Sequence, residues 1–212
     1  VVAEDANLVT KVEGHEELLL PPAKRFDVLV RWEDAGSYKL STLAYTTGKT
    51  GDDYPERVLA TFKVAGETVA PVAMPTTMGE LPNDQAPTMQ ADTVAARRTM
   101  VFSEDNKAGT FFINGKAFTD GAPDVTVKLG TTEEWTIKNT TQEEHPFHIH
   151  VNDFQIMSIN GKSNDALSLQ DTVKLPIGGE VVIRMRFLDY VGKYVFHCHI
   201  LAHEDAGMMA TV

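Results

Sequence analysis

The chain has 212 residues, of which 42% are hydrophobic and 23% are charged, a balance that is ordinary for a globular protein and excludes collagen, coiled coils and wholesale disorder. Its 30 acidic and 19 basic residues give a formal net charge of −11, which argues against a nucleic-acid partner and against an anionic membrane surface. No apolar run reaches the roughly 20 residues of a membrane-spanning helix.

Short segments rich in β-branched and aromatic residues recur along the chain, and Gly, Pro, Asp and Asn separate them. Turn signals such as Asn114-Gly115 and Gly178-Gly179 stand between these segments. Many short strands with little helical periodicity predict an all-β sandwich or barrel. We expect strands at Phe26–Val30, Arg57–Val64, Phe111–Ile113, Val125–Leu129, Glu134–Lys138, Val181–Phe187 and Tyr194–His197.

The chain divides into two parts at residues 69–94, which contain prolines and threonines without alternation and are predicted to be a linker or a long surface connection. Residues 95–212 are long enough for a complete β-sandwich. Residues 1–68 are too few for one, and they open on Val1-Val2-Ala3, which resembles the middle of a strand. We therefore expect a mature, trimmed or partial chain in which residues 1–68 are part of a preceding domain.

Six of the seven histidines lie in two short segments, HPFHIH at 145–150 and HCHILAH at 197–203, and only His15 lies elsewhere. Side chains alternate between the two faces of a strand. If both segments are extended, each presents two histidines on one face and a different ligand on the other. Bringing the segments together would therefore build two metal sites back to back.

The first expected site combines a thiolate, two imidazoles and a thioether, which is the ligand set of a blue-copper electron-transfer centre. Its residues are His145, Cys198, His203 and Met208. The second site has four imidazoles, which suit copper, zinc, iron or nickel, so that the ligand type alone does not choose the metal. Its residues are His148, His150, His197 and His199. Because Cys198 is covalently flanked by His197 and His199, an electron has a short through-bond route between the sites.

The motif HPFHIH at 145–150 together with HCHILAHEDAGMM at 197–209 resembles the copper-binding signatures of multicopper oxidases, the group of laccases, bilirubin oxidases and cuprous oxidases. The resemblance covers residues 95–212, which are similar to the family's C-terminal cupredoxin domain, a Greek-key β-sandwich. LLLPPAKRFDVLV at 18–30 more weakly resembles the last strands of the preceding cupredoxin domain.

The resemblance implies a role for each candidate ligand. The type 1 copper would be bound by His145, Cys198, His203 and Met208, the type 2 copper by His148, and the type 3 pair by His150, His197 and His199. A methionine at the axial position implies a moderate potential. The implied reaction oxidises a small reducing substrate one electron at a time and reduces dioxygen to water. The substrate would be a phenol, a pigment, or a cuprous or ferrous ion, in a periplasmic or secreted setting.

The sequence departs from the family pattern in one respect. Half of the family's trinuclear-cluster histidines come from two His-x-His motifs in the N-terminal domain, and this sequence has no such motif outside the two segments. We expect an N-terminal cupredoxin domain, in the same precursor or in another chain, to complete the cluster, and the chain to be inactive without it.

Several alternatives remain at this stage. Glu204 and Asp205 follow a candidate ligand and would relay protons to dioxygen, or they form a solvated acidic turn. A zinc hydrolase or purely structural histidines would leave Cys198 and Met208 unexplained. A single-site electron carrier, a non-catalytic copper-binding module and a copper nitrite reductase are further candidates, of which the last fits less well. A soft cuprous-ion patch, or ordinary packing, would account for Met74, Met78, Met89 and Met100.

Overall fold

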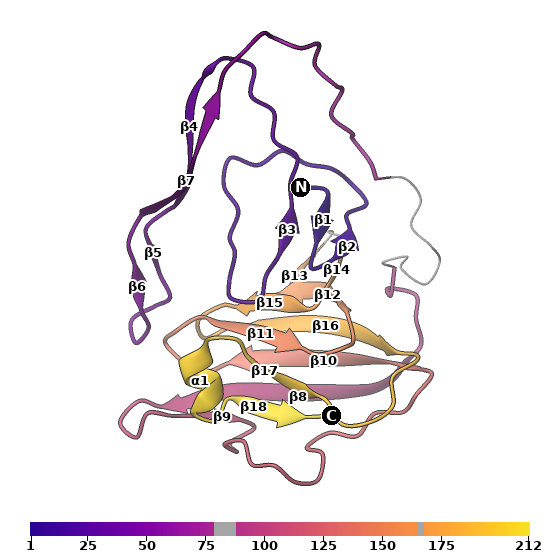
Figure 1. The fold of residues 1–212 in the computed structure, drawn as a ribbon. Coiled ribbons are helices and arrows are strands. Elements are labelled where there is room, and N and C mark those ends of the chain that lie inside the picture. The colour runs from indigo at the N-terminus through magenta and orange to yellow at the C-terminus, as the bar shows by residue number, and fades with distance from the viewer. Residues whose placement is uncertain (79–87, 165–167) are drawn as a thin grey trace.

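The computed structural model describes residues 1–78, 88–164 and 168–212, and its main body is a two-sheet β-sandwich (Figure 1). Seven strands form one sheet in the order β13-β12-β16-β10-β8-β9, with β14 paired to β12, and four strands form the other in the order β15-β11-β17-β18. Strands adjacent in space are mostly not consecutive in sequence, and β8 pairs with β10 in parallel. The expected all-β fold is therefore present.

The strands of the seven-stranded sheet are β8 (Val94–Asp105), β9 (Thr110–Ile113), β10 (Thr131–Asn139), β12 (Phe154–Ile159), β13 (Lys162–Ser163), β14 (Leu169–Gln170) and β16 (Glu180–Phe187). Those of the four-stranded sheet are β11 (His145–Ile149), β15 (Thr172–Leu175), β17 (Val195–Cys198) and β18 (Met209–Thr211). The single helix of the described residues, α1 (Leu201–Asp205), links β17 to β18. No helix in the described ranges has the length and apolar character needed to cross a membrane.

The hydrophobic core lies between the two sheets. Every second residue of β16 is buried, from Val181 to Phe187, as alternation predicts for a strand with one face inward. Trp135 of β10 and Phe196 of β17 meet across the core, with ring centroids 5.4 Å apart in an edge-to-face arrangement. Each fully buried aliphatic or aromatic side chain contributes about 1.5–3 kcal/mol to folding, so this layer fixes how the four-stranded sheet sits on its partner.

The N-terminal residues form smaller pieces around the sandwich. They comprise β1 (Ala3–Glu4), β2 (Asn7–Leu8), β3 (Phe26–Asp27), β4 (Gly36–Thr42), β5 (Tyr45–Thr46), β6 (Asp53–Tyr54) and β7 (Arg57–Val64). The β4–β7 hairpin extends away from the sandwich (Figure 1). Only Ala3 and Asp5 are buried in residues 1–68, all of which are described, so this part contacts the sandwich mainly through polar groups.

Three of the expected strands include residues that lie outside the observed strands. Val125–Leu129 is not a strand, because its neighbour β18 is three residues long and meets this segment only at its start, where the N–H groups of Asp124 and Val125 both donate to Thr211 O. Phe26–Val30 pairs only at its first two residues, since β1 offers only two partners. Tyr194–His197 is shifted by one residue to Val195–Cys198.

Part of the expected linker, residues 79–87, lies outside the described residues. At its C-terminal end, Met89 is 3% exposed and its N–H donates to Gln155 Oε1. Arg184 donates to the carbonyl oxygens of Met89 and Gln90. This stretch therefore packs against the seven-stranded sheet before β8 begins.

Candidate metal centres

One cysteine and two histidines converge where β11 begins and β17 ends. The Cys198 Sγ atom lies 3.7 Å from His145 Nδ1 and 3.8 Å from His203 Nδ1, and the two Nδ1 atoms are 3.2 Å apart. Metal–ligand bonds of about 2.0–2.3 Å put two ligands of one ion roughly 3–4 Å apart, so these three atoms fit a single ion. We call these residues the cysteine centre.

The expected axial residue, Met208, is fully buried beside this centre. Its N–H donates to His203 O at 2.9 Å, and its carbonyl accepts the Cys198 N–H at 3.0 Å. The preceding Gly207 has a φ of 114°, and a Cβ there would lie 2.8 Å from Ala117 Cβ. A glycine is therefore needed where the chain turns from α1 into the position of Met208.

Burial determines the protonation of the cysteine centre. Burial lowers the pKa of His145 to about 3, and the neighbouring His203 lowers it further. Burial also lowers the pKa of His203 and raises the pKa of the Cys198 thiol. Without a metal the centre thus holds two neutral imidazoles and a thiol, and binding a cation would release the thiol proton.

Two neighbours orient the imidazoles of the cysteine centre. The Phe111 ring stacks on His203 with centroids 4.0 Å apart and planes 16° apart. Thr141 Oγ1 lies 2.9 Å from His145 Nε2, a contact that favours a proton on Nε2 and leaves the Nδ1 lone pair facing the cysteine.

Two largely buried carboxylates that the sequence analysis did not identify lie beside this centre. Glu143 Oε2 lies 3.6 Å from His203 Nε2, and Glu104 Oε2 lies 3.9 Å from His145 Nε2. Burial raises the pKa of Glu143, and Glu104 adds to that shift. Glu143 stands two residues before His145, so the sequence could have indicated that it lies near this centre. Glu104 comes from the distant strand β8 and could not be found in this way.

The other four histidines gather on the opposite face of β11 and β17. In the register of this pair, His148 lies opposite His197 and Phe147 lies opposite Cys198. The ring centroids of neighbouring members are 4.9–5.4 Å apart, and His150 Nε2 lies 3.1 Å from His197 Nε2. The members of this histidine cluster are His148, His150, His197 and His199, whose imidazoles suit a transition metal.

The two acidic residues of α1 have different positions. Glu204 Oε2 lies 3.1 Å from His197 Nδ1, whereas Asp205 is exposed. The structure thus brings one of the two candidate proton carriers against the histidine cluster.

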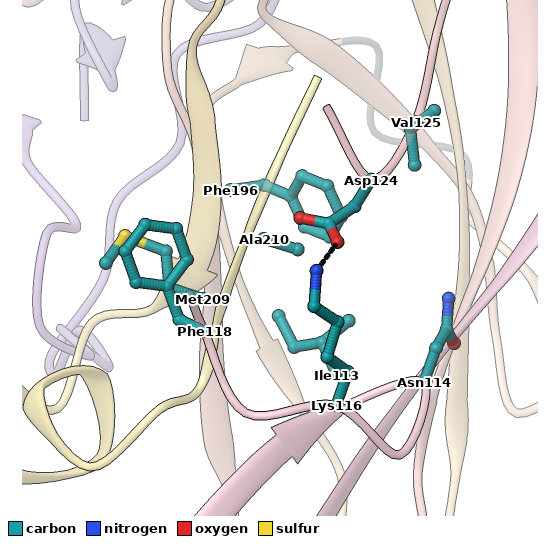
Figure 2. A pocket seen from close by; sticks show the side chains of 9 residues that line it. All are labelled: Ile113, Asn114, Lys116, Phe118, Asp124, Val125, Phe196, Met209 and Ala210. Carbon is teal, nitrogen blue, oxygen red and sulfur yellow. Dashed lines mark hydrogen bonds and ion pairs between the residues drawn. The ribbon is translucent and has the colours of Figure 1, made fainter. Parts of the chain in front are cut away.

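The methionines considered as a cuprous-ion patch differ in burial, and Met78 is intermediate. Met89 and Met100 are 3% and 2% exposed, whereas Met74 is 41% exposed. A separate cavity of about 130 Å³ lies beside Phe196, and the Lys116–Asp124 ion pair of 2.7 Å borders it (Figure 2). None of the eight candidate ligands lines this cavity.

Comparison with known proteins gives consistent matches. A family model described as multicopper oxidase matches residues 82–212. The multicopper oxidase mco of Staphylococcus aureus is 41% identical over 47% of this chain and 24% of its own length. A laccase of Haloferax volcanii is 31% identical over 92% of this chain and 34% of its own length.

A solved structure of a multicopper oxidase from Campylobacter jejuni, described as a metallo-oxidase, superposes with a TM-score of 0.82 and 29% identity. The superposition covers 99% of this chain and 47% of the Campylobacter jejuni chain. This similarity identifies the sandwich as cupredoxin-like. The chain spans less than half the length of each of these three proteins.

Proposed function

Because this chain belongs to the multicopper oxidase family, we propose that it forms the C-terminal copper-binding part of an oxidase. The proposed reaction couples one-electron oxidation of a reducing substrate at the cysteine centre to four-electron reduction of dioxygen to water at a trinuclear cluster. The supporting observation is that the cysteine centre and the histidine cluster lie on opposite faces of the same two strands. Cys198 belongs to the cysteine centre, and its two chain neighbours, His197 and His199, belong to the histidine cluster.

In this proposal each ligand has the role that its motif position implies. Type 1 copper is held by His145, Cys198, His203 and Met208, type 2 copper by His148, and the type 3 pair by His150, His197 and His199. The donor sets fit copper, since a thiolate with two imidazoles suits blue copper and imidazoles suit the cluster. Bound copper ions supply the one-electron redox chemistry of the reaction.

The protein supplies an electron path and protons. His197 and His199 are covalently joined to Cys198, so the path from the cysteine centre to the histidine cluster runs along one strand. Glu204, which contacts His197 Nδ1, holds protons for dioxygen reduction, and the exposed Asp205 connects it to solvent.

An N-terminal cupredoxin domain, in the same precursor or in another chain, would provide the remaining cluster ligands. The reducing substrate would be a phenol, a pigment, or a cuprous or ferrous ion. A periplasmic or secreted location is part of the same proposal.

The direct test is the copper content of the chain and its visible spectrum after loading with copper. One copper per chain with an intense blue thiolate band is expected for the chain alone, with further copper and dioxygen consumption when the N-terminal domain is added. The Cys198→Ser variant should lose the band but keep the four imidazoles of the histidine cluster. A colourless copper-loaded chain, or one that binds zinc in preference, would refute the type 1 assignment.

The same experiment separates the alternative functions. Copper binding with a blue band but no dioxygen consumption, even with the N-terminal domain present, would identify a single-site electron carrier. Copper binding with neither electron transfer nor turnover would identify a non-catalytic copper-binding module.

A further inference from the structure

The imidazole of His148 has hydrogen-bond partners on the side that faces away from the histidine cluster. His148 lies opposite Thr172 in the β11–β15 pair. Its Nδ1 atom is 3.0 Å from the carbonyl oxygen of Asp171 and 3.0 Å from Thr172 Oγ1. A carbonyl oxygen can only accept a hydrogen bond, so the proton of the neutral ring belongs on Nδ1.

The hydroxyl of Thr172 fits the same arrangement. It donates its own proton to Asp171 Oδ1 at 2.7 Å, so that its lone pairs are free to accept from His148 Nδ1. With the proton on Nδ1, the Nε2 lone pair is available to a metal. The ring of His148 lies 4.9 Å from that of His150 and 5.4 Å from that of His197, centroid to centroid.

The group that secures Asp171 comes from the N-terminal part of the chain. Arg25 Nη1 donates to Asp171 Oδ1 at 2.9 Å and Arg25 Nη2 donates to Asp171 Oδ2 at 2.7 Å, which is a two-pronged guanidinium–carboxylate pair. The buried Asp5 carboxylate accepts the N–H groups of Arg25, Asp171 and Thr172 at 3.1–3.2 Å. The backbone around Asp171 is therefore fixed from both its side chain and its amides.

We propose that Arg25 and Asp171 are positioning residues for His148, which fix its tautomer and orientation so that Nε2 is presented to a metal. Residues 1–68 thereby take part in metal binding without contributing a ligand. This inference rests on the proposed function only in taking His148 as a metal ligand. Outer hydrogen-bond partners of metal-binding histidines typically change metal affinity by about 10–100-fold.

The test uses ¹⁵N NMR of the histidine rings in the full metal-free chain, followed by titration with Zn²⁺. The unmodified chain should show a proton on Nδ1 of His148. In Arg25→Gln and in Asp171→Asn, the ring should become a mixture of tautomers, and the Zn²⁺ affinity reported by the His148 ring should fall by about tenfold or more. Because the two act as one pair, the double variant should be no weaker than the weaker single variant.

Two further variants control for folding and charge. Arg186→Gln removes a similar two-pronged pair, which Arg186 of strand β16 forms with Asp92, and should leave the His148 tautomer and the Zn²⁺ affinity unchanged. Arg25→Lys keeps the charge and should recover part of the affinity.

An unchanged His148 tautomer with Zn²⁺ affinity within about twofold of the original, or additive losses in the double variant, would overturn the inference. A loss of Zn²⁺ affinity in Arg186→Gln as large as that in Arg25→Gln would also overturn the inference. Because neither readout needs oxidase activity, a chain that never consumes dioxygen leaves the test intact.

Discussion

The buried histidine of the cysteine centre should make the metal-free chain sensitive to mild acid. His145 is 0% exposed, and burial lowers its pKa to about 3, with His203 as a further cause. In the unfolded chain the ordinary value of about 6.5 applies. Between these two values the unfolded chain binds a proton at this site and the folded chain does not, so stability is present above pH 6.5 and is lost as the pH falls toward 3.

The size of the effect follows from the difference between the two pKa values. One pH unit corresponds to about 1.4 kcal/mol, so the roughly 1.5 units between pH 6.5 and pH 5 lower the free energy of unfolding by about 2 kcal/mol. Between pH 7 and pH 6.5, His145 lowers the free energy of unfolding only slightly. A fall to pH 5 should therefore remove a substantial part of the stability of an ordinary domain.

The assay is urea unfolding of the metal-free chain and of His145→Gln at pH 7 and pH 5. Glutamine keeps a polar group near Thr141 without titrating. The loss between the two pH values should be about 2 kcal/mol smaller in the variant, because the other buried histidines act in both chains and cancel. An equal loss in the two chains would refute the assignment of acid sensitivity to His145.

Three further outcomes are expected. Asp5→Asn removes one of the two carboxylates that pair with the buried ammonium of Lys24, at 2.9 Å, while Glu4 at 2.6 Å remains, so the free energy of unfolding in urea titrations should fall by about 2 kcal/mol. Phe111→Leu removes the ring stacked on His203 and should cost about 1 kcal/mol beyond the loss of buried area, read from thermal unfolding of the copper-loaded chain. Removing copper with a chelator should lower the Tm, since a ligand at a hundred times its Kd contributes about 2.7 kcal/mol; an unchanged Tm would argue against a folded-state copper site.

Local alternation made the grouping of the candidate ligands predictable. Period-two geometry puts Cys198 opposite its two histidine neighbours, and the register of β11 against β17 follows from burying Phe147, Ile149 and Phe196. The residues that gather in each centre are therefore determined by short segments. The metal that they hold is not determined in this way, because four imidazoles accept several metals.

Contacts between distant segments were beyond reach of the sequence. Arg25 meets Asp171 across 146 residues, and no periodicity or motif links the two. Val125–Leu129 has the composition of a strand, but pairing also needs a neighbour of matching length, which the three-residue β18 does not offer. β-Propensity describes how well a residue suits a sheet and not whether a partner strand is there.

The N-terminal part of the chain contacts residues that neighbour both centres, although few of its own residues are buried. Near His148 its contacts come from Asp5 and Arg25, and beside the cysteine centre Thr47 Oγ1 donates to Glu143 Oε1 at 2.9 Å. The hydrophobic core, by contrast, comes from residues 100–212. Residues 1–68 thus help to hold groups beside the metal centres from outside the hydrophobic core, in addition to Phe111 and Thr141 of the sandwich. Because tight metal binding needs ligands held in place as well as a stable scaffold, changes in residues 1–68 should affect the centres as well as the stability of the fold.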